Sequence, residues 1–240
     1  MDNNSDNRAI IAAWTVATDH LDDFGEEGDF TRQRLLNPAI FTLLGPVAGR
    51  SILDAGCGQG YLCRLLAKRG AWVTGVEPAA PWYQVAVERE RREPLGITYL
   101  QADLSTLVVS SHFDVVVANM VLMDIPAYEA AIHCCVAALA PGGDFIFSLA
   151  HPCFEESSPA WDGKECVVVR EYLAEYVIPQ TIAPRFHRPL SRYLNHVIDA
   201  GCALRHIMEP QLGEEWANLG PAYERNVHVP SVILVHAAKS

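Results

Sequence analysis

The chain has 240 residues, of which half are apolar and a fifth are charged, and its formal net charge is −11 with a pI near 5.2. This composition is that of an ordinary globular protein with a substantial core. The acidic balance argues against DNA, RNA or an anionic membrane surface as a partner, because all of these are polyanions.

The polar and acidic first residues contain no apolar segment, so we expect no signal peptide. The apolar runs are too short to span a bilayer. The seven cysteines are an odd number without a C-x-x-C pair, which favours reduced thiols in a reducing compartment. These features predict a cytoplasmic protein and leave its oligomeric state open.

Residues 1–49 precede the first predicted strand and predict two helices. Apolar residues at near-helical spacing predict a helix over 9–21, and a second helix is predicted over 31–44. Helices without a strand partner at this place usually cover the site of an α/β fold as a lid. We therefore expect Trp14 to contact a substrate, and Arg32, beside an acidic loop, to bind a carboxylate of a bound ligand.

The segment 51–70 predicts a buried strand, a glycine turn and a helix, which is the first unit of a nucleotide-binding α/β domain. A dinucleotide fingerprint is G-x-G-x-x-G. Here the pattern is G-x-G-x-G, and Asp54 precedes it. A carboxylate at this place would repel a diphosphate but suits a ligand with ammonium and sulfonium groups. The segment resembles motif I of the class I S-adenosylmethionine-dependent methyltransferases.

Acidic residues follow the next two predicted strands, over 71–77 and 97–100. Parallel strands joined by right-handed crossovers end at one edge of a sheet, so Glu77 should share a pocket with Asp54. We expect Glu77 to accept hydrogen bonds from the hydroxyls of a ribose, a role that a NAD-binding protein would also need. The resemblance implies that Asp103 holds the adenine amino group.

A continuous apolar run over 113–118 predicts a buried central strand of a parallel sheet. Ligands bind at the ends of such strands, so Asn119, Met120 and Asp124 are candidate pocket residues. Amino-methyltransferases that act on nucleobases typically carry an Asn/Asp-Pro-Pro-Tyr-like motif here. This chain does not, which argues against a nucleic-acid substrate.

A helix predicted over 128–139 is followed by Pro-Gly-Gly and a fifth strand over 144–149, again as in the methyltransferases. With motif I and the acidic strand ends, the resemblance covers 51–150 closely. From the residues and from this resemblance together, we expect the following cofactor contacts: Arg32, Asp54, Gly56, Gly58, Gly60, Glu77, Pro78, Asp103, Leu104, Asn119 and Met120.

Residues 151–184 are irregular and rich in aromatic residues and proline, which is typical of a small-molecule lid. After them we expect a helix ending at Gly201, a strand over 203–207 and an antiparallel last strand over 231–236. This part resembles, more loosely, small-molecule methyltransferases, many of them in natural-product biosynthesis. The expected substrate contacts are Trp14, Asp124, Phe154, Tyr172, Tyr176 and Tyr193.

Methylation of a hydroxyl requires removal of its proton, ideally by a group that titrates near neutrality, and histidine meets that requirement. His151 follows the fifth predicted strand at the edge where the pocket opens, so we expect it to act as the base or to orient the substrate. His187 is the second candidate. The other histidines are scattered without a metal-ligand spacing, so we expect no catalytic metal.

The sequence therefore predicts a single α/β domain with a Rossmann-like, doubly wound sheet of seven strands, mostly parallel with an antiparallel last strand. We expect an N-terminal helical lid (1–49), a cofactor-binding core (50–150), a substrate-lid insertion (151–184) and the C-terminal part of the sheet (185–240).

The expected activity is methyl transfer from S-adenosylmethionine to an oxygen, hydroxyl or carboxyl, of a small secondary metabolite, with S-adenosylhomocysteine as product. An N-methyltransferase acting on a small amine or indole is an alternative. A NAD(P)-dependent oxidoreductase and a non-catalytic partner subunit are less favoured.

Overall fold

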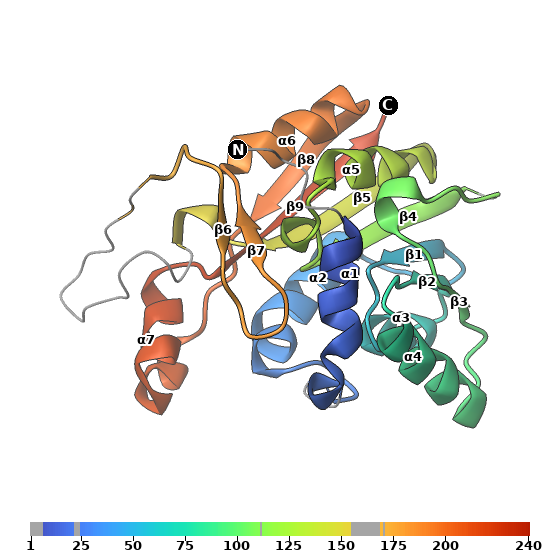
Figure 1. Cartoon of the computed structure of the whole chain (residues 1–240), viewed down its shortest axis with the longest axis horizontal. Helices are drawn as coiled ribbons and strands as arrows, with labels where there is room; N and C mark the ends of the chain where they lie inside the picture. Colours follow the sequence, from blue (N-terminus) through green and yellow to red (C-terminus); the bar gives the residue numbers. More distant parts are fainter. Residues whose placement is uncertain (1–6, 22–24, 111, 155–168, 170) are drawn as a thin grey trace.

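The computed structural model describes residues 7–21, 25–110, 112–154, 169 and 171–240. Its centre is a seven-stranded sheet with strand order β3-β2-β1-β4-β5-β9-β8, beside which lies a separate two-stranded sheet, β6-β7. Helices cover both faces of the large sheet (Figure 1). The strands of the large sheet are β1 (Ser51–Ala55), β2 (Trp72–Val76), β3 (Thr98–Leu100), β4 (Phe113–Asn119), β5 (Leu139–Ala150), β8 (Cys202–Met208) and β9 (Val232–Lys239).

The first five strands of the large sheet run parallel, because each is joined to the next by a crossover that contains helical structure. The last strand, β9, pairs antiparallel with both β5 and β8. The predicted Rossmann-like sheet with an antiparallel last strand is thus confirmed. The carboxyl ends of β1 to β4, where the acidic and amide residues lie, are consequently at one edge of the sheet.

Two apolar cores lie on opposite faces of the sheet. On one face, α2 (Asn37–Leu44) and α3 (Tyr61–Ala67) pack on the strands, and α4 (Ala80–Arg92) lies beside them. On the other, α5 (Tyr128–Ala137) and α6 (Leu190–Asp199) form the cover. The continuous apolar run of β4 follows from this arrangement, since Val115 and Val116 on alternate faces are both fully buried.

The N-terminal segment contains α1 (Asn7–Val16), which is shorter than the helix expected over 9–21. The α-helix stops because Ala17 has a non-helical backbone, with φ −81° and ψ 48°, and a short 3₁₀ turn follows. The second expected helix begins as a π-helical turn over Arg32–Leu36 that continues into α2.

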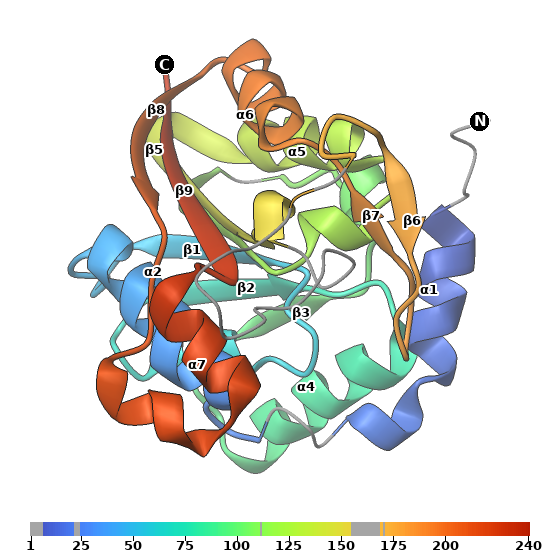
Figure 2. The ribbon, with the colours of Figure 1, turned by 90° about the vertical axis from the view of Figure 1, so that its left-hand side faces the viewer.

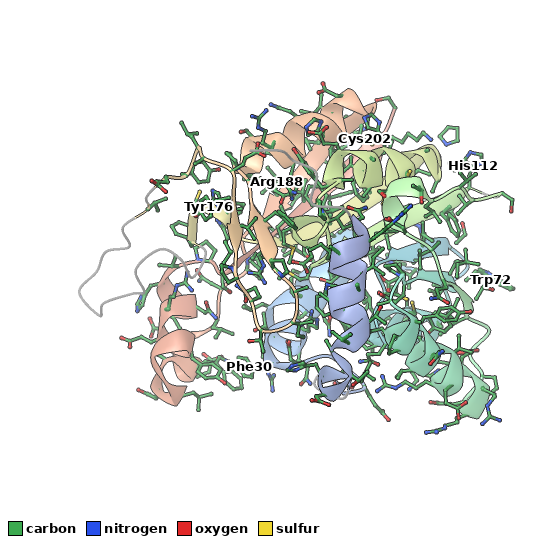
Figure 3. The ribbon with its side chains drawn as sticks, viewed as in Figure 1. Phe30, Trp72, His112, Tyr176, Arg188 and Cys202 are labelled. Atoms are coloured by element: carbon green, nitrogen blue, oxygen red, sulfur yellow. The ribbon has the colours of Figure 1, made fainter. Side chains whose placement is uncertain are left out.

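The irregular segment after β5 contains a hairpin that the sequence pattern does not reveal. Strands β6 (Tyr176–Ile178) and β7 (Arg185–His187) pair antiparallel. The boundary expected between residues 184 and 185 therefore falls inside one hairpin, and the large sheet resumes only at β8. Figures 1 and 2 both show this hairpin beside α1, and Figure 3 marks it by Tyr176.

Two further elements differ from expectation. The Pro-Gly-Gly sequence lies inside β5 rather than before it, at an irregularity in the register with β4. The loop expected before the last strand contains a 3₁₀ helix (Glu214–Leu219) and α7 (Pro221–His228). Trp216 and Tyr223 from this region pack on Phe30, with ring centroids 5.2 and 4.8 Å away.

Among the helices of the described residues, none has the length and apolar character that crossing a bilayer requires. The described cysteines are free thiols, and Cys166 lies outside the described residues.

Candidate active site

A cavity of ≈ 380 Å³ lies at the carboxyl edge of the parallel strands, in the size range of small-molecule sites. The sheet edge, α1, the turn after β4 and the β6–β7 hairpin contribute its walls. The lining residues are Asn7, Ile10, Ile11, Trp14, Arg32, Asp54, Gly56, Cys57, Gly58, Gln59, Tyr61, Leu62, Glu77, Pro78, Trp82, Asp103, Leu104, Asn119, Met120, Val121, Met123, Asp124, Ile125, Pro126, Gln180, Thr181, Ile182, Ala183 and Arg185.

All of the predicted cofactor contacts except Gly60 line this cavity. Gly60 begins α3 with φ +81°, and a Cβ there would clash with the hydroxyl of Tyr99. The glycine at this position permits close packing of α3 against β3, and contact of Gly60 with the cofactor stays a prediction. Of the predicted substrate contacts, Trp14 and Asp124 line the cavity.

Two buried carboxylates stand at the ends of neighbouring strands. Glu77 accepts hydrogen bonds from the amides of Gly58 (3.0 Å) and Ala79 (2.8 Å), so its carboxylate also orders the glycine turn. Asp54 accepts one from the thiol of Cys63 at 3.1 Å. Burial raises the pKa of Asp54 to about 6 and that of Glu77 to about 7. A cationic ligand would lower both pKa values by favouring the ionised forms.

Asp103 connects the third strand to the N-terminal helix. Its carboxylate accepts hydrogen bonds from the side-chain amide of Asn7, at 3.2 Å to each oxygen, and from the amide of Ser105 at 2.9 Å. At the other end of α1, the carbonyl of Trp14 accepts a hydrogen bond of 3.0 Å from the indole of Trp82. The helix is therefore held over the cavity at both of its ends.

The glycine turn has the features of a binding surface for a cationic ligand. Gly58 has φ +55°, and a Cβ there would meet only Trp82, at 3.8 Å, so the turn is open toward the cavity. The buried side-chain oxygen of Gln59 has no hydrogen-bond partner among the described residues. Together with Asp54, this oxygen suits an ammonium group, whereas the carboxylates of Asp54 and Glu77 would repel a diphosphate. The site therefore fits S-adenosylmethionine better than NAD(P).

A chain of polar side chains continues from the central strand. Asn119 donates to the hydroxyl of Tyr61 at 2.7 Å and accepts from Ser148 at 2.7 Å. Met120, which follows, has φ 58°, a left-handed conformation that is uncommon for methionine, and its amide is held by Ser148 at 2.9 Å. Such strain is found at ligand sites that the surrounding structure holds in place. Arg32 forms a 2.5 Å ion pair with Asp29.

Neither predicted histidine lines the cavity. His151 is 4% exposed, and its Nε2 lies 2.8 Å from Glu209 while its Nδ1 accepts from the amide of Cys153. The Nε2 of His187 lies 3.0 Å from the carbonyl of Tyr172, and its ring stacks on Tyr176 at 4.4 Å. A catalytic role for either imidazole stays a prediction.

Four predicted substrate contacts also lie away from the cavity lining: Phe154, Tyr172, Tyr176 and Tyr193. Tyr193 is 1% exposed and belongs to the core beside Tyr128, at a ring distance of 5.1 Å. The hydroxyl of Tyr172 accepts from the amide of Leu190 at 2.9 Å, at the start of α6. Tyr172, Tyr176 and Tyr193 thereby support the hairpin and α6, whereas Phe154 lies against His151 at a ring distance of 4.7 Å.

Sequence reasoning missed the wall that the hairpin provides, and from the turn after β4 it missed Val121, Met123, Ile125 and Pro126. Residues 180–183 and Arg185 reach the cavity only because β6 and β7 pair with each other. No periodic pattern in the sequence predicts this pairing. Behind the turn, the buried guanidinium of Arg188 (Figure 3) donates to the carbonyls of Ile125 (3.0 Å) and Pro126 (3.2 Å) and lies 4.1 Å from the ring of Tyr128. It thereby fixes one wall of the cavity.

The raised pKa values predict a pH-dependent affinity for S-adenosylmethionine. The ligand's ammonium group stays protonated below about pH 7.7, while Glu77, with a pKa of about 7, becomes ionised. We expect binding measured by titration calorimetry to tighten by about 20-fold between pH 5.5 and 7.5, as the ionised fraction of one such carboxyl rises. The variant Glu77→Gln should show a much flatter profile.

The stability of the ligand-free protein should change in the opposite direction. The folded pKa of Glu77 lies above its ordinary value of 4.5, so the folded state retains a proton that the unfolded chain releases. Stability is then lost as the pH rises from about 4.5 toward about 7. For the affinity prediction, a Kd for S-adenosylmethionine that stays constant between pH 5.5 and 7.5 would contradict the assignment of Glu77 to the cofactor.

No group of three or more potential metal ligands occurs among the residues described by the structure.

Comparison with known proteins agrees with the geometry. Residues 53–147 match the family model described as "Methyltransferase domain". The chain is 29% identical over 199 residues to a ubiquinone biosynthesis O-methyltransferase of Photorhabdus laumondii, covering 78% of this chain and 77% of that protein. A protein of the same name from Alkalilimnicola ehrlichii is 37% identical over 107 residues, which cover 44% of this chain and 43% of that protein.

Solved structures show the same relationship. A crystal structure of an S-adenosylmethionine-dependent methyltransferase from Mesorhizobium loti superposes with a TM-score of 0.75 at 28% identity, over 84% of this chain and 96% of that one. The cofactor that the sequence pattern implied is thus confirmed. Residues 53–147 thus carry a methyltransferase domain, and the chain is similar in sequence and in fold to S-adenosylmethionine-dependent methyltransferases, with its cavity at the carboxyl edge of the sheet.

Proposed function

We propose that the protein methylates an oxygen atom of a small molecule. The observation that carries this proposal is the cavity itself, which is walled on the acceptor side by α1 and by the β6–β7 hairpin and has a volume of ≈ 380 Å³. A macromolecular substrate would need an open groove, whereas a cavity of this size suits a small molecule. The relatives named as O-methyltransferases support oxygen as the acceptor.

When bound, S-adenosylmethionine supplies an electrophilic methyl group on its sulfonium. Glu77 and Asp103 would hold its nucleoside part, and Asp54 with the glycine turn its amino-acid part. The task of the remaining walls is to place an acceptor oxygen in line with that methyl group and to exclude water, and such positioning accounts for much of the rate enhancement in reactions of this kind.

The acceptor's proton needs a recipient, and Asp124 is the best placed carboxylate. It lies in the turn after β4 and lines the cavity, together with residues of α1 and of the hairpin. Its side chain is 17% exposed. We therefore assign to Asp124 the role of orienting the acceptor hydroxyl and receiving its proton. His151 and His187 remain the alternatives for this role.

The proposal is tested by incubating the protein with methyl-labelled S-adenosylmethionine and metabolite extracts, and by identifying the labelled product by mass spectrometry and NMR. We expect an O-methyl signal. A labelled N-methyl product would instead favour the alternative of a small amine acceptor, and no transfer from a protein that binds the cofactor would contradict the proposal.

With an acceptor in hand, Asp124→Asn is expected to lower kcat by about 100-fold or more, the usual size of a general-base contribution, with an unchanged Kd for the cofactor. His151→Phe serves as the matched comparison. If that substitution abolishes transfer in a folded protein while Asp124→Asn does not, the base is His151.

A further inference from the structure

We propose that the methyl acceptor carries a carboxylate and that Arg185 binds it. This inference rests on the proposed function, because it names the class of molecule that the acceptor side of the cavity selects. It comes from an arginine that none of the sequence motifs single out.

Arg185 reaches the cavity from β7, next to the tip of the hairpin. Its charged partner among the described residues is Asp124, whose carboxylate oxygen lies 3.9 Å from Nε. That separation is too long for a hydrogen bond. Nε is buried and has no hydrogen-bond partner in the described part of the chain.

A buried guanidinium nitrogen without a partner is unfavourable, and a ligand that supplies an acceptor removes the penalty. A carboxylate matches the planar fork of an arginine in a bidentate manner and forms charge-assisted hydrogen bonds. The cavity lining that the hairpin and the turn after β4 supply includes the apolar side chains of Ile125, Ile182 and Ala183. An acceptor with an apolar body and one anionic end fits this combination.

The other arginine of the cavity lining has a different environment. Arg32 is held by Asp29 at 2.5 Å and lies near Gly28 and Tyr61, beside the glycine turn. Arg32 is thus placed at the end of the cavity where the amino-acid part of the cofactor would lie. Arg185 lies instead beside Asp124, on the acceptor side. We therefore assign Arg32 to the cofactor and Arg185 to the methyl acceptor.

The test compares benzoate with benzamide, which have the same shape and differ in charge. Both are titrated by NMR into the full chain saturated with S-adenosylhomocysteine, so that the readout does not depend on catalysis. We expect benzoate to bind about tenfold more tightly than benzamide, and Arg185→Gln to remove this preference. Arg192→Gln is the matched control, because it removes the same charge from an arginine that is 60% exposed and outside the cavity lining.

The affinity of each variant for S-adenosylmethionine separates the alternatives. If Arg185→Gln weakens cofactor binding and leaves the benzoate preference intact, Arg185 serves the cofactor and the inference is overturned. The same holds if the unaltered protein does not prefer benzoate. If the preference depends on Arg185 but no oxygen acceptor is ever methylated, the carboxylate site stands and the proposed function fails.

Discussion

Replacing Glu77 by alanine is expected to weaken binding of S-adenosylmethionine by about 100-fold or more, because charge-assisted hydrogen bonds to the ribose, together about 3 kcal/mol, are lost. The substitution also removes the acceptor for the amides of Gly58 and Ala79. The glycine turn then loses part of its support. Titration calorimetry measures the effect directly.

Glu90 offers a matched control for this experiment. Like Glu77, it accepts hydrogen bonds from backbone amides, those of Leu95 (2.7 Å) and Gly96 (2.8 Å) among them, but it does not line the cavity. Glu90→Ala should lower the melting temperature and leave the Kd for the cofactor unchanged within a few fold. Equal losses of affinity in both variants would show that Glu77 acts through stability alone.

The second large effect is expected for Gly56→Ala. Gly56 has φ +76°, and a Cβ there would clash with the side chain of Val121, which lines the cavity. The left-handed backbone costs about 1–2 kcal/mol for a residue with a Cβ, and overpacking adds about 1–3 kcal/mol. We expect the free energy of unfolding, measured with denaturant, to fall by about 2–5 kcal/mol, and cofactor binding to fall with it.

Gly49 separates these two contributions, since its φ is +77° and nothing lies within 4 Å of a Cβ built there. Gly49→Ala should show only the backbone cost and keep cofactor affinity. Combining Gly56→Ala with Val121→Ala should recover part of the lost stability. If Gly49→Ala proves as damaging as Gly56→Ala, contact with Val121 does not explain the requirement for glycine.

The cofactor half of the site could be predicted from the sequence because its residues are local to strand ends. Asp54 lies near the end of the first predicted strand, Glu77 and Asp103 follow the next two, and the topology of parallel strands brings all three to one edge. The glycine pattern predicts Gly60 as a cofactor contact for the same reason. The structure adds a second requirement for glycine there, because a Cβ would clash with the hydroxyl of Tyr99.

Only part of the acceptor half could be predicted in this way, namely Trp14 and Asp124, which line the cavity. His151, His187 and Tyr193 also have the chemistry of a site, but all three are buried, hydrogen-bonded to other groups and outside the cavity lining. Which polar side chain faces a cavity depends on how irregular segments fold over it, and that is decided by contacts distant in sequence.

By itself, the sequence determined the sheet, its order of strands along the chain and the cationic cofactor, because buried strands, glycine turns and acidic strand ends are local signals. Only the tertiary structure showed that the β6–β7 hairpin forms a wall of the cavity. Pairing of β6 with β7 brings Arg185 to the cavity. There the Nε of Arg185 lies 3.9 Å from a carboxylate oxygen of Asp124, although 61 positions separate the two residues in the chain. No local sequence pattern predicts this contact, because it forms only when the hairpin folds over the edge of the sheet.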